Sequence, residues 1–75
     1  MAAVISLRSN DDRGQEILDK FQEWTVSAGM RAEVRDDGTR RFTSFSGRGA
    51  DVDAFDRFLD RIDADWRDHV TKLNS

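Results

Sequence analysis

The sequence predicts a small α+β domain whose elements follow one another in the order β-α-β-β-α. Three segments in which apolar and polar residues alternate indicate strands, at residues 3–8, 30–35 and 39–46. Two longer segments in which apolar residues recur every three or four positions indicate amphipathic helices, at residues 11–28 and 51–73.

The composition indicates one domain, residues 1–75, that holds no cofactor and no disulfide. The chain has 75 residues, no Cys and a single His, so a zinc site would need several carboxylate ligands, which is rare. A chain of this size buries only about 60% of the surface that its unfolded form exposes. Oligomerisation is therefore the remaining way to add stability.

No apolar run approaches the roughly 20 residues of a membrane helix, and the first residues lack the basic segment of a signal peptide. We therefore expect a cytoplasmic protein that makes no contact with a membrane. The net charge of −3 is unevenly spread. Residues 30–49 carry five Arg and three acidic residues, whereas residues 50–75 carry four basic residues and seven Asp. Such asymmetry can mark a surface for a partner.

The first strand and the first helix have recognisable boundaries. Ile5 and Leu7 share one face of the strand. Ser9 or Asn10 can cap the helix, and Gly29 supplies the left-handed residue that ends it. The apolar arc of this helix comprises Ile17, Leu18, Phe21, Trp24, Thr25 and Ala28.

The register of the following hairpin can be predicted by matching its faces. A two-residue turn would pair core positions with solvent positions. A three-residue turn with Gly38 in the left-handed bulge position instead pairs Ala32 with Phe42 and Glu33 with Arg41. We expect this register, because it gives an apolar pair inside and an ion pair outside. The inward residues of the first hairpin strand are then Met30, Ala32 and Val34.

The second helix is predicted to run from about Asp51 to Leu73. Its apolar stripe comprises Val52, Phe55, Leu59, Ile62, Trp66, Val70 and Leu73. A helix of this length spans about 34 Å, against about 20 Å for a six-residue strand. We therefore expect the last apolar positions to extend beyond the sheet and to need another cover.

The predicted arrangement resembles a ferredoxin-like split β-α-β unit that lacks its last strand. A right-handed crossover and an antiparallel hairpin give a three-stranded sheet in the order 1-3-2, with both helices on one face. The missing fourth strand would leave the first strand as an open edge. Because the resemblance is one of topology, it implies no particular function.

His69 is the one candidate for acid–base chemistry. It lies one turn after Asp65 on the predicted helix, so Asp65 could orient it as a general base. We favour the alternative, a half-buried surface His near a helix C-terminus. The loop Ser46-Gly47-Arg48-Gly49 could hold an anion, or it could be an ordinary turn, since it matches no phosphate-binding motif. Because no nucleophile motif accompanies His69, we expect that the protein is not an enzyme.

Two charged surfaces are candidate binding sites. An acidic stripe on the second helix could dock a basic partner or imitate a row of phosphates, as a decoy inhibitor of a nucleic-acid-binding enzyme would; the alternative is a solvated helix face. Its residues are Asp53, Asp56, Asp60 and Asp63. The outer sheet face could hold single-stranded nucleic acid by stacking and phosphate contacts, although the sequence pI of about 5.0 opposes this. Its candidate residues are Arg31, Arg35, Arg41 and Phe45, of which Phe45 could instead turn into the core at a bulge.

We expect a non-enzymatic protein-interaction module, an accessory or regulatory protein that acts as a homodimer and binds a further, unidentified protein. The open edge of the first strand invites pairing with a second copy, and the overhanging helix ends could meet across the same two-fold axis. The candidate dimer contacts are Ile5, Ser6, Leu7, Trp66, Val70 and Leu73. Nucleic-acid binding through the sheet face is the alternative function.

Overall fold

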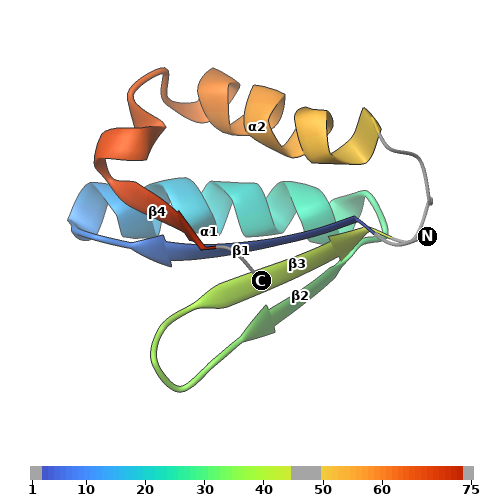
Figure 1. Ribbon diagram of the computed structural model, residues 1–75, viewed down its shortest axis with the longest axis horizontal. Coiled ribbons are helices and arrows are strands. Elements are labelled where there is room, and N and C mark those ends of the chain that lie inside the picture. The colour runs from blue at the N-terminus through green and yellow to red at the C-terminus, as the bar shows by residue number, and fades with distance from the viewer. Residues whose placement is uncertain (1–2, 45–49, 74–75) are drawn as a thin grey trace.

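The computed structural model describes residues 3–44 and 50–73, which form two helices on one face of an antiparallel sheet (Figure 1). The elements are β1 Ala3–Ser9, α1 Asp12–Ser27, β2 Arg31–Val34, β3 Arg40–Ser44, α2 Ala50–Ile62, the 3-10 turn η1 Trp66–Asp68, and β4 Val70–Leu73. The first three strands and the first helix lie within two residues of their predicted bounds. No helix among the described residues is long and apolar enough to cross a bilayer.

The sheet has four strands, in the order β2-β3-β1-β4. The prediction of three strands is therefore wrong, and so is the prediction that β1 is an open edge. β4 pairs antiparallel with β1, with Leu73 opposite Ser6 and Val70 opposite Ser9, while β3 pairs with the other side of β1. The chain thus has the complete β-α-β-β-α-β order of a ferredoxin-like topology.

The second helix ends at Ile62, so the predicted continuation to Leu73 is also wrong. The carboxylate of Asp63 accepts the backbone N–H of Asp65 at 2.8 Å, a local turn that competes with the helix. Trp66 and Val70 are both buried in the observed turn and strand. Because a turn followed by a strand buries the same positions that a helical stripe would, the apolar spacing alone does not separate the two structures.

α1 is capped by Asp11, whose carboxylate accepts the N–H of Gly14 at 2.8 Å. The sequence pointed to Ser9 or Asn10 instead. Both are used otherwise, because β1 continues to Ser9 and the N–H of Asn10 donates to the carbonyl of His69 at 2.8 Å. The predicted end of the helix is confirmed, since Gly29 has a φ of 81°.

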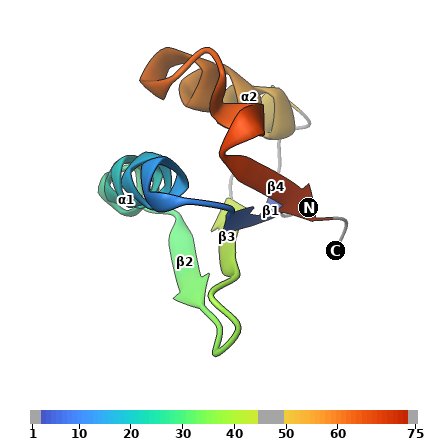
Figure 2. The ribbon, with the colours of Figure 1, turned by 90° about the vertical axis from the view of Figure 1, so that its left-hand side faces the viewer.

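The predicted hairpin register is confirmed: Ala32 lies opposite Phe42 and Glu33 opposite Arg41. Gly38 has a φ of 86° and donates its N–H to the carbonyl of Arg35 at 3.0 Å, as expected for the bulged turn. Val34 lies on the same face of β2 as Ala32, as expected, but it is not part of the core, because its side chain is 62% exposed. Val34 lies on the edge strand of a hairpin that extends away from both helices (Figure 2).

The core lies between the helices and the inner face of the sheet. Phe21 of α1 is at its centre, with ring centroids 4.7 Å from Phe42 of β3 and 5.9 Å from Phe55 of α2, both edge-to-face. Trp66, from the turn after α2, is fully buried and adds the largest side chain. The segment after α2 is therefore part of the core and does not overhang it.

Candidate functional site

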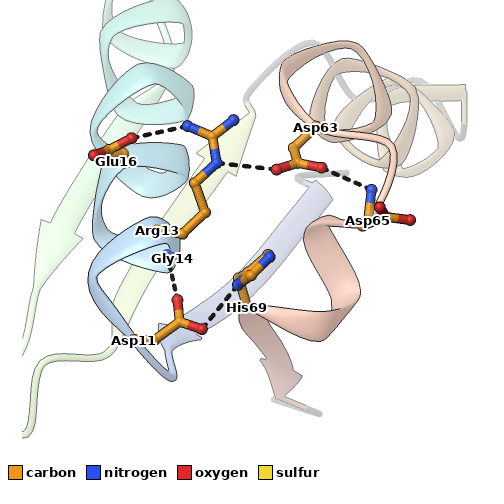
Figure 3. A network of polar contacts seen from close by, with 7 residues as sticks. All are labelled: Asp11, Arg13, Gly14, Glu16, Asp63, Asp65 and His69. Atoms are coloured by element: carbon orange, nitrogen blue, oxygen red, sulfur yellow. Dashed lines mark hydrogen bonds and ion pairs between the residues drawn. The ribbon is translucent and has the colours of Figure 1, made fainter.

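His69 and Asp11 form a closely bonded pair where the chain before α1 meets the chain before β4 (Figure 3). The Nδ1 atom of His69 lies 2.8 Å from one carboxylate oxygen of Asp11, while the other oxygen caps α1 through Gly14. The expected orienting partner, Asp65, is not the one that His69 contacts. Asp11 was missed because it is 58 residues away in sequence, and only the tertiary structure brings the two side chains together.

The contact favours the charged form of both residues of the pair. The hydrogen bond from His69, helped by the N–H of Gly14, holds the pKa of Asp11 below its ordinary value. The same contact with Asp11 raises the pKa of His69 above 6.5, and the charges of Asp63 and Asp68 act in the same direction. An imidazole held in this way ties two chain segments together, and we interpret the pair as a structural clasp.

Arg13 extends this clasp from α1 to the turn after α2 (Figure 3). Its Nε donates to Asp63 at 3.0 Å and its Nη1 to Glu16 at 2.8 Å. The N–H of Asp65 and the guanidinium of Arg13 together lower the pKa of Asp63. Residues 63–69 are therefore fastened to the first turn of α1 by two adjacent ion pairs.

The His69 pair predicts a pH dependence of stability. Because the folded pKa of His69 is raised, its contribution is complete below its unfolded pKa, 6.5, and is lost as the pH rises through the folded value. Because the pKa of Asp11 is lowered, its contribution is present above its ordinary value of 3.8 and is lost as the pH falls through the folded value. We therefore expect the denaturant midpoint to decrease as the pH rises above 6.5 and His69 loses its proton.

The matched control is Asp11→Asn, which keeps a side-chain oxygen to cap α1 but removes the charge. In this variant the midpoint should change less with pH, and the pKa of His69 in an NMR titration should move back toward 6.5. His69 is the only His, so its resonance is unambiguous. An ordinary His69 pKa in the unmodified protein would show that the clasp does not form in solution.

Three of the four side chains of the acidic stripe contact other residues of the same chain. Asp56 lies 3.3 Å from the Nζ of Lys72 on β4, Asp60 accepts the indole N–H of Trp66 at 2.8 Å, and Asp63 pairs with Arg13. Asp53, the fourth member, has an exposed side chain. A basic partner or a phosphate-like display would have to compete with these internal contacts, so the stripe fits a fastening role better than a docking role.

The predicted dimer contacts on β1 lie inside the chain. Ile5, Ser6 and Leu7 are buried, and β1 has a strand on each side. Trp66 and Val70 are buried in the core, and Leu73 pairs with β1. The prediction of a dimer contact at the edge of β1 is therefore wrong, because β4 already uses the backbone groups that a second copy would need.

The outer sheet face carries the side chains that the hairpin register predicted. Arg31, Glu33 and Arg41 share it, since they lie in pairs of the ladder that alternate with Ala32–Phe42. The expected partner of Glu33 was Arg41, but its ion pair is with Arg31, at 3.0 Å. The Nε of Arg41 is buried without a hydrogen-bond partner. Arg35 lies just beyond β2 and is exposed, and both Phe45 and the loop at residues 46–49 lie outside the described residues.

Two edges of the sheet remain, and β2 forms one of them. Beside it, a groove runs between β2 and α1, lined by Asp19, Gln22, Glu23, Val26, Val34 and Arg40. Val26 and Val34, at 57% and 62% exposure, are the exposed large hydrophobic side chains of the described part of the chain. Both line this groove, and sequence reasoning missed it because Val34 was assigned to the core.

Arg40 lines this groove and ties β3 to α1. Its guanidinium donates to Asp19 at 2.8 Å and to Gln15 at 2.9 Å, with a longer contact to Gln22. Its side chain is only 14% exposed, so the groove has a fixed polar wall beside its two valines. An apolar strip next to ordered polar groups is typical of a protein-contact surface.

A smaller notch between the two helices is lined by Trp24, Ala54, Arg57, Phe58 and Arg61. The rings of Trp24 and Phe58 stack there, with centroids 4.2 Å apart and planes 11° apart. The stack joins α1 to α2 and packs against the core. We interpret it as part of the helix–helix contact.

Comparison with known proteins identifies no family model, no curated protein and no solved structure that this chain matches. Among residues 3–44 and 50–73, no group of three or more His, Asp or Glu side chains is placed to hold a metal ion. The geometry of the chain itself is therefore the basis for a functional proposal.

Proposed function

We propose that this chain is a small non-enzymatic protein-interaction module that acts as a homodimer, with the edge of β2 and the adjacent groove as its contact surface. The proposal keeps the homodimer that the sequence suggested. It moves the contact from β1, which β4 covers, to β2 at the other side of the sheet.

The observation that carries the proposal is the position of Val26 and Val34. Both are exposed, both line the groove beside β2, and β2 is a terminal strand of the sheet. β2, Arg-Ala-Glu-Val, carries no Pro, and its two charged residues have opposite signs and share one face, so they can complement a second strand. A sheet edge next to exposed apolar side chains favours association.

The charged clusters support a binding role over a catalytic one. His69 is bonded to Asp11, which caps a helix, and Asp63 is bonded to Arg13. In each case the side chain holds two segments of the fold together, and its removal would act on stability first. A catalytic group would instead be placed beside a nucleophile or a pocket.

The test is the solution mass measured over a range of concentrations up to about 1 mM, a range that detects dimers with a Kd in the micromolar range or below. We expect a mass approaching twice 8.6 kDa. Val34→Asp should shift the dimer toward monomer by at least about tenfold in Kd, or about 1.4 kcal/mol, because it places a charge in the contact. The fold should be unaffected, because this side chain is exposed in the monomer.

Lys20→Gln is the matched control. It changes the net charge by the same amount on an exposed part of α1 that does not line the groove, so the Kd should not change. A monomeric mass for the unmodified protein at every concentration would contradict the proposed function.

A further inference from the structure

We infer that two copies of this chain pair through β2 in one particular antiparallel register, with Ala32 opposite Ala32 of the second copy at a two-fold axis. This inference rests on the proposed homodimer and specifies its contact. Two four-stranded sheets would then join into one continuous eight-stranded sheet.

The backbone of β2 offers its outward hydrogen-bonding groups at Ala32 and Val34. The N–H of Arg35 donates to the carbonyl of Thr39 at 2.8 Å, so Arg35 directs its groups toward β3. Bonded and non-bonded pairs alternate along an antiparallel ladder, so Glu33 and Arg31 also direct theirs toward β3. Ala32 and Val34 direct theirs away from β3, toward the open edge. A second copy can therefore exchange backbone hydrogen bonds at Ala32.

The side chains of β2 match their own reversed order in this register. With Ala32 at the centre, Arg31 lies opposite Glu33 of the second copy and Glu33 lies opposite Arg31 of the second copy. Directly opposed residues on one face of such a pair have Cβ atoms about 4.5 to 5.5 Å apart, within reach of an ion pair. Arg31 and Glu33 already contact each other within one chain at 3.0 Å. The two copies would thus bring together four charges of alternating sign.

The inner face matches in the same register. Met30 would lie opposite Val34 of the second copy, on the side of the sheet that carries the helices. Met30 packs against the core, whereas Val34 is exposed in the single chain. The contact would cover Val34 with an apolar side chain twice per dimer, next to the groove that Val26 lines.

The neighbouring registers either place like charges opposite each other or pair the inner face of one strand with the outer face of the other. A shift by one residue would place Ala32 opposite Glu33 and so mix the inner face with the outer face. A shift by two residues restores the faces but places Glu33 opposite Glu33 and Arg31 opposite Arg35, and directly opposed like charges are destabilising. Among these three registers, the one centred on Ala32 satisfies the backbone hydrogen bonds, the charges and the apolar faces together.

The test uses two charge-reversal variants, Arg31→Glu and Glu33→Arg, both at exposed positions. Each alone puts like charges opposite each other, so each should weaken its own homodimer by at least about tenfold in Kd. An equimolar mixture should form a heterodimer, because Glu at position 31 of one chain then faces Arg at position 33 of the other, and both pairs are complementary. Native mass spectrometry separates the heterodimer from both homodimers.

Arg8→Glu on β1 is the matched control, since it reverses an exposed charge on the same sheet away from β2 and should leave the Kd unchanged. Circular dichroism and thermal melts establish that each variant is folded. A dimer that both single reversals leave intact, or two weakened variants that do not associate when mixed, would overturn this register. A monomeric unmodified protein would instead overturn the proposed homodimer itself, so the two failures are distinguishable.

Discussion

Trp66→Ala should lower the free energy of unfolding by about 3 to 5 kcal/mol, the range found for large aromatic side chains removed from a core. The ring of Trp66 is fully buried, and its indole N–H donates to Asp60 at 2.8 Å. Removing it would leave a cavity under the turn between α2 and β4 and would break the hydrogen bond to Asp60. Denaturant unfolding followed by far-ultraviolet circular dichroism measures the loss.

Arg67→Ala is the neighbouring control, because this guanidinium lies 4.4 Å from the centroid of the Trp66 ring but on the solvent side. Its loss should cost less than about 1 kcal/mol, as exposed cation–π contacts do. If the protein tolerated Trp66→Ala as readily as Arg67→Ala, the ring would be exposed and the assignment of the 66–73 segment to the core would be wrong.

Gly14→Ala should destabilise the protein by about 1 to 3 kcal/mol, the usual cost of forcing extra atoms into a packed site. A Cβ at this position would lie 2.3 Å from the carbonyl oxygen of His69 and 3.0 Å from the Cβ of Ser9. The His69 carbonyl cannot move away freely, because it accepts the N–H of Asn10. The substitution therefore forces α1 and the chain before β4 apart.

The sign of this effect makes it a sharp test. In a helix without tertiary contacts, Gly to Ala is stabilising by about 1 kcal/mol. A peptide of residues 9–29 with the substitution should accordingly be more helical by circular dichroism, while the whole protein is less stable. A whole protein stabilised by Gly14→Ala would show that the close approach between His69 and α1 is absent in solution.

The local elements could be predicted because the signals that specify them are local. Gly29 and Gly38 adopt the left-handed conformation expected of them, and the register that pairs Ala32 with Phe42 follows from matching faces over a few residues. The arc that contains Phe21 faces the core for the same reason. In each case a residue near in sequence decides the conformation.

The candidate site could not be predicted in the same way. The position of β2 at an edge of the sheet was predicted, but the groove also depends on Val34 lying outside the cover of α1, which the alternation within β2 does not decide. The charged clasp joins Asp11 to His69 across 58 residues. What could be anticipated was the face that each residue of β2 occupies, and the proposed register follows from that alternation.

The sequence by itself determined the α+β class, the first three strands, the first helix and the hairpin register of this protein, because periodicity and turn residues act over short distances. Only the tertiary structure decided the conformation of residues 63–73, a turn followed by a strand. Their spacing is compatible with a helix, but the edge of β1 offers hydrogen bonds to a strand, and the core offers a place for Trp66. Pairing with a sheet edge and burying a large ring outweigh local helix preference. The same outcome makes β1 an interior strand and leaves β2 and β4 as the edges of the sheet.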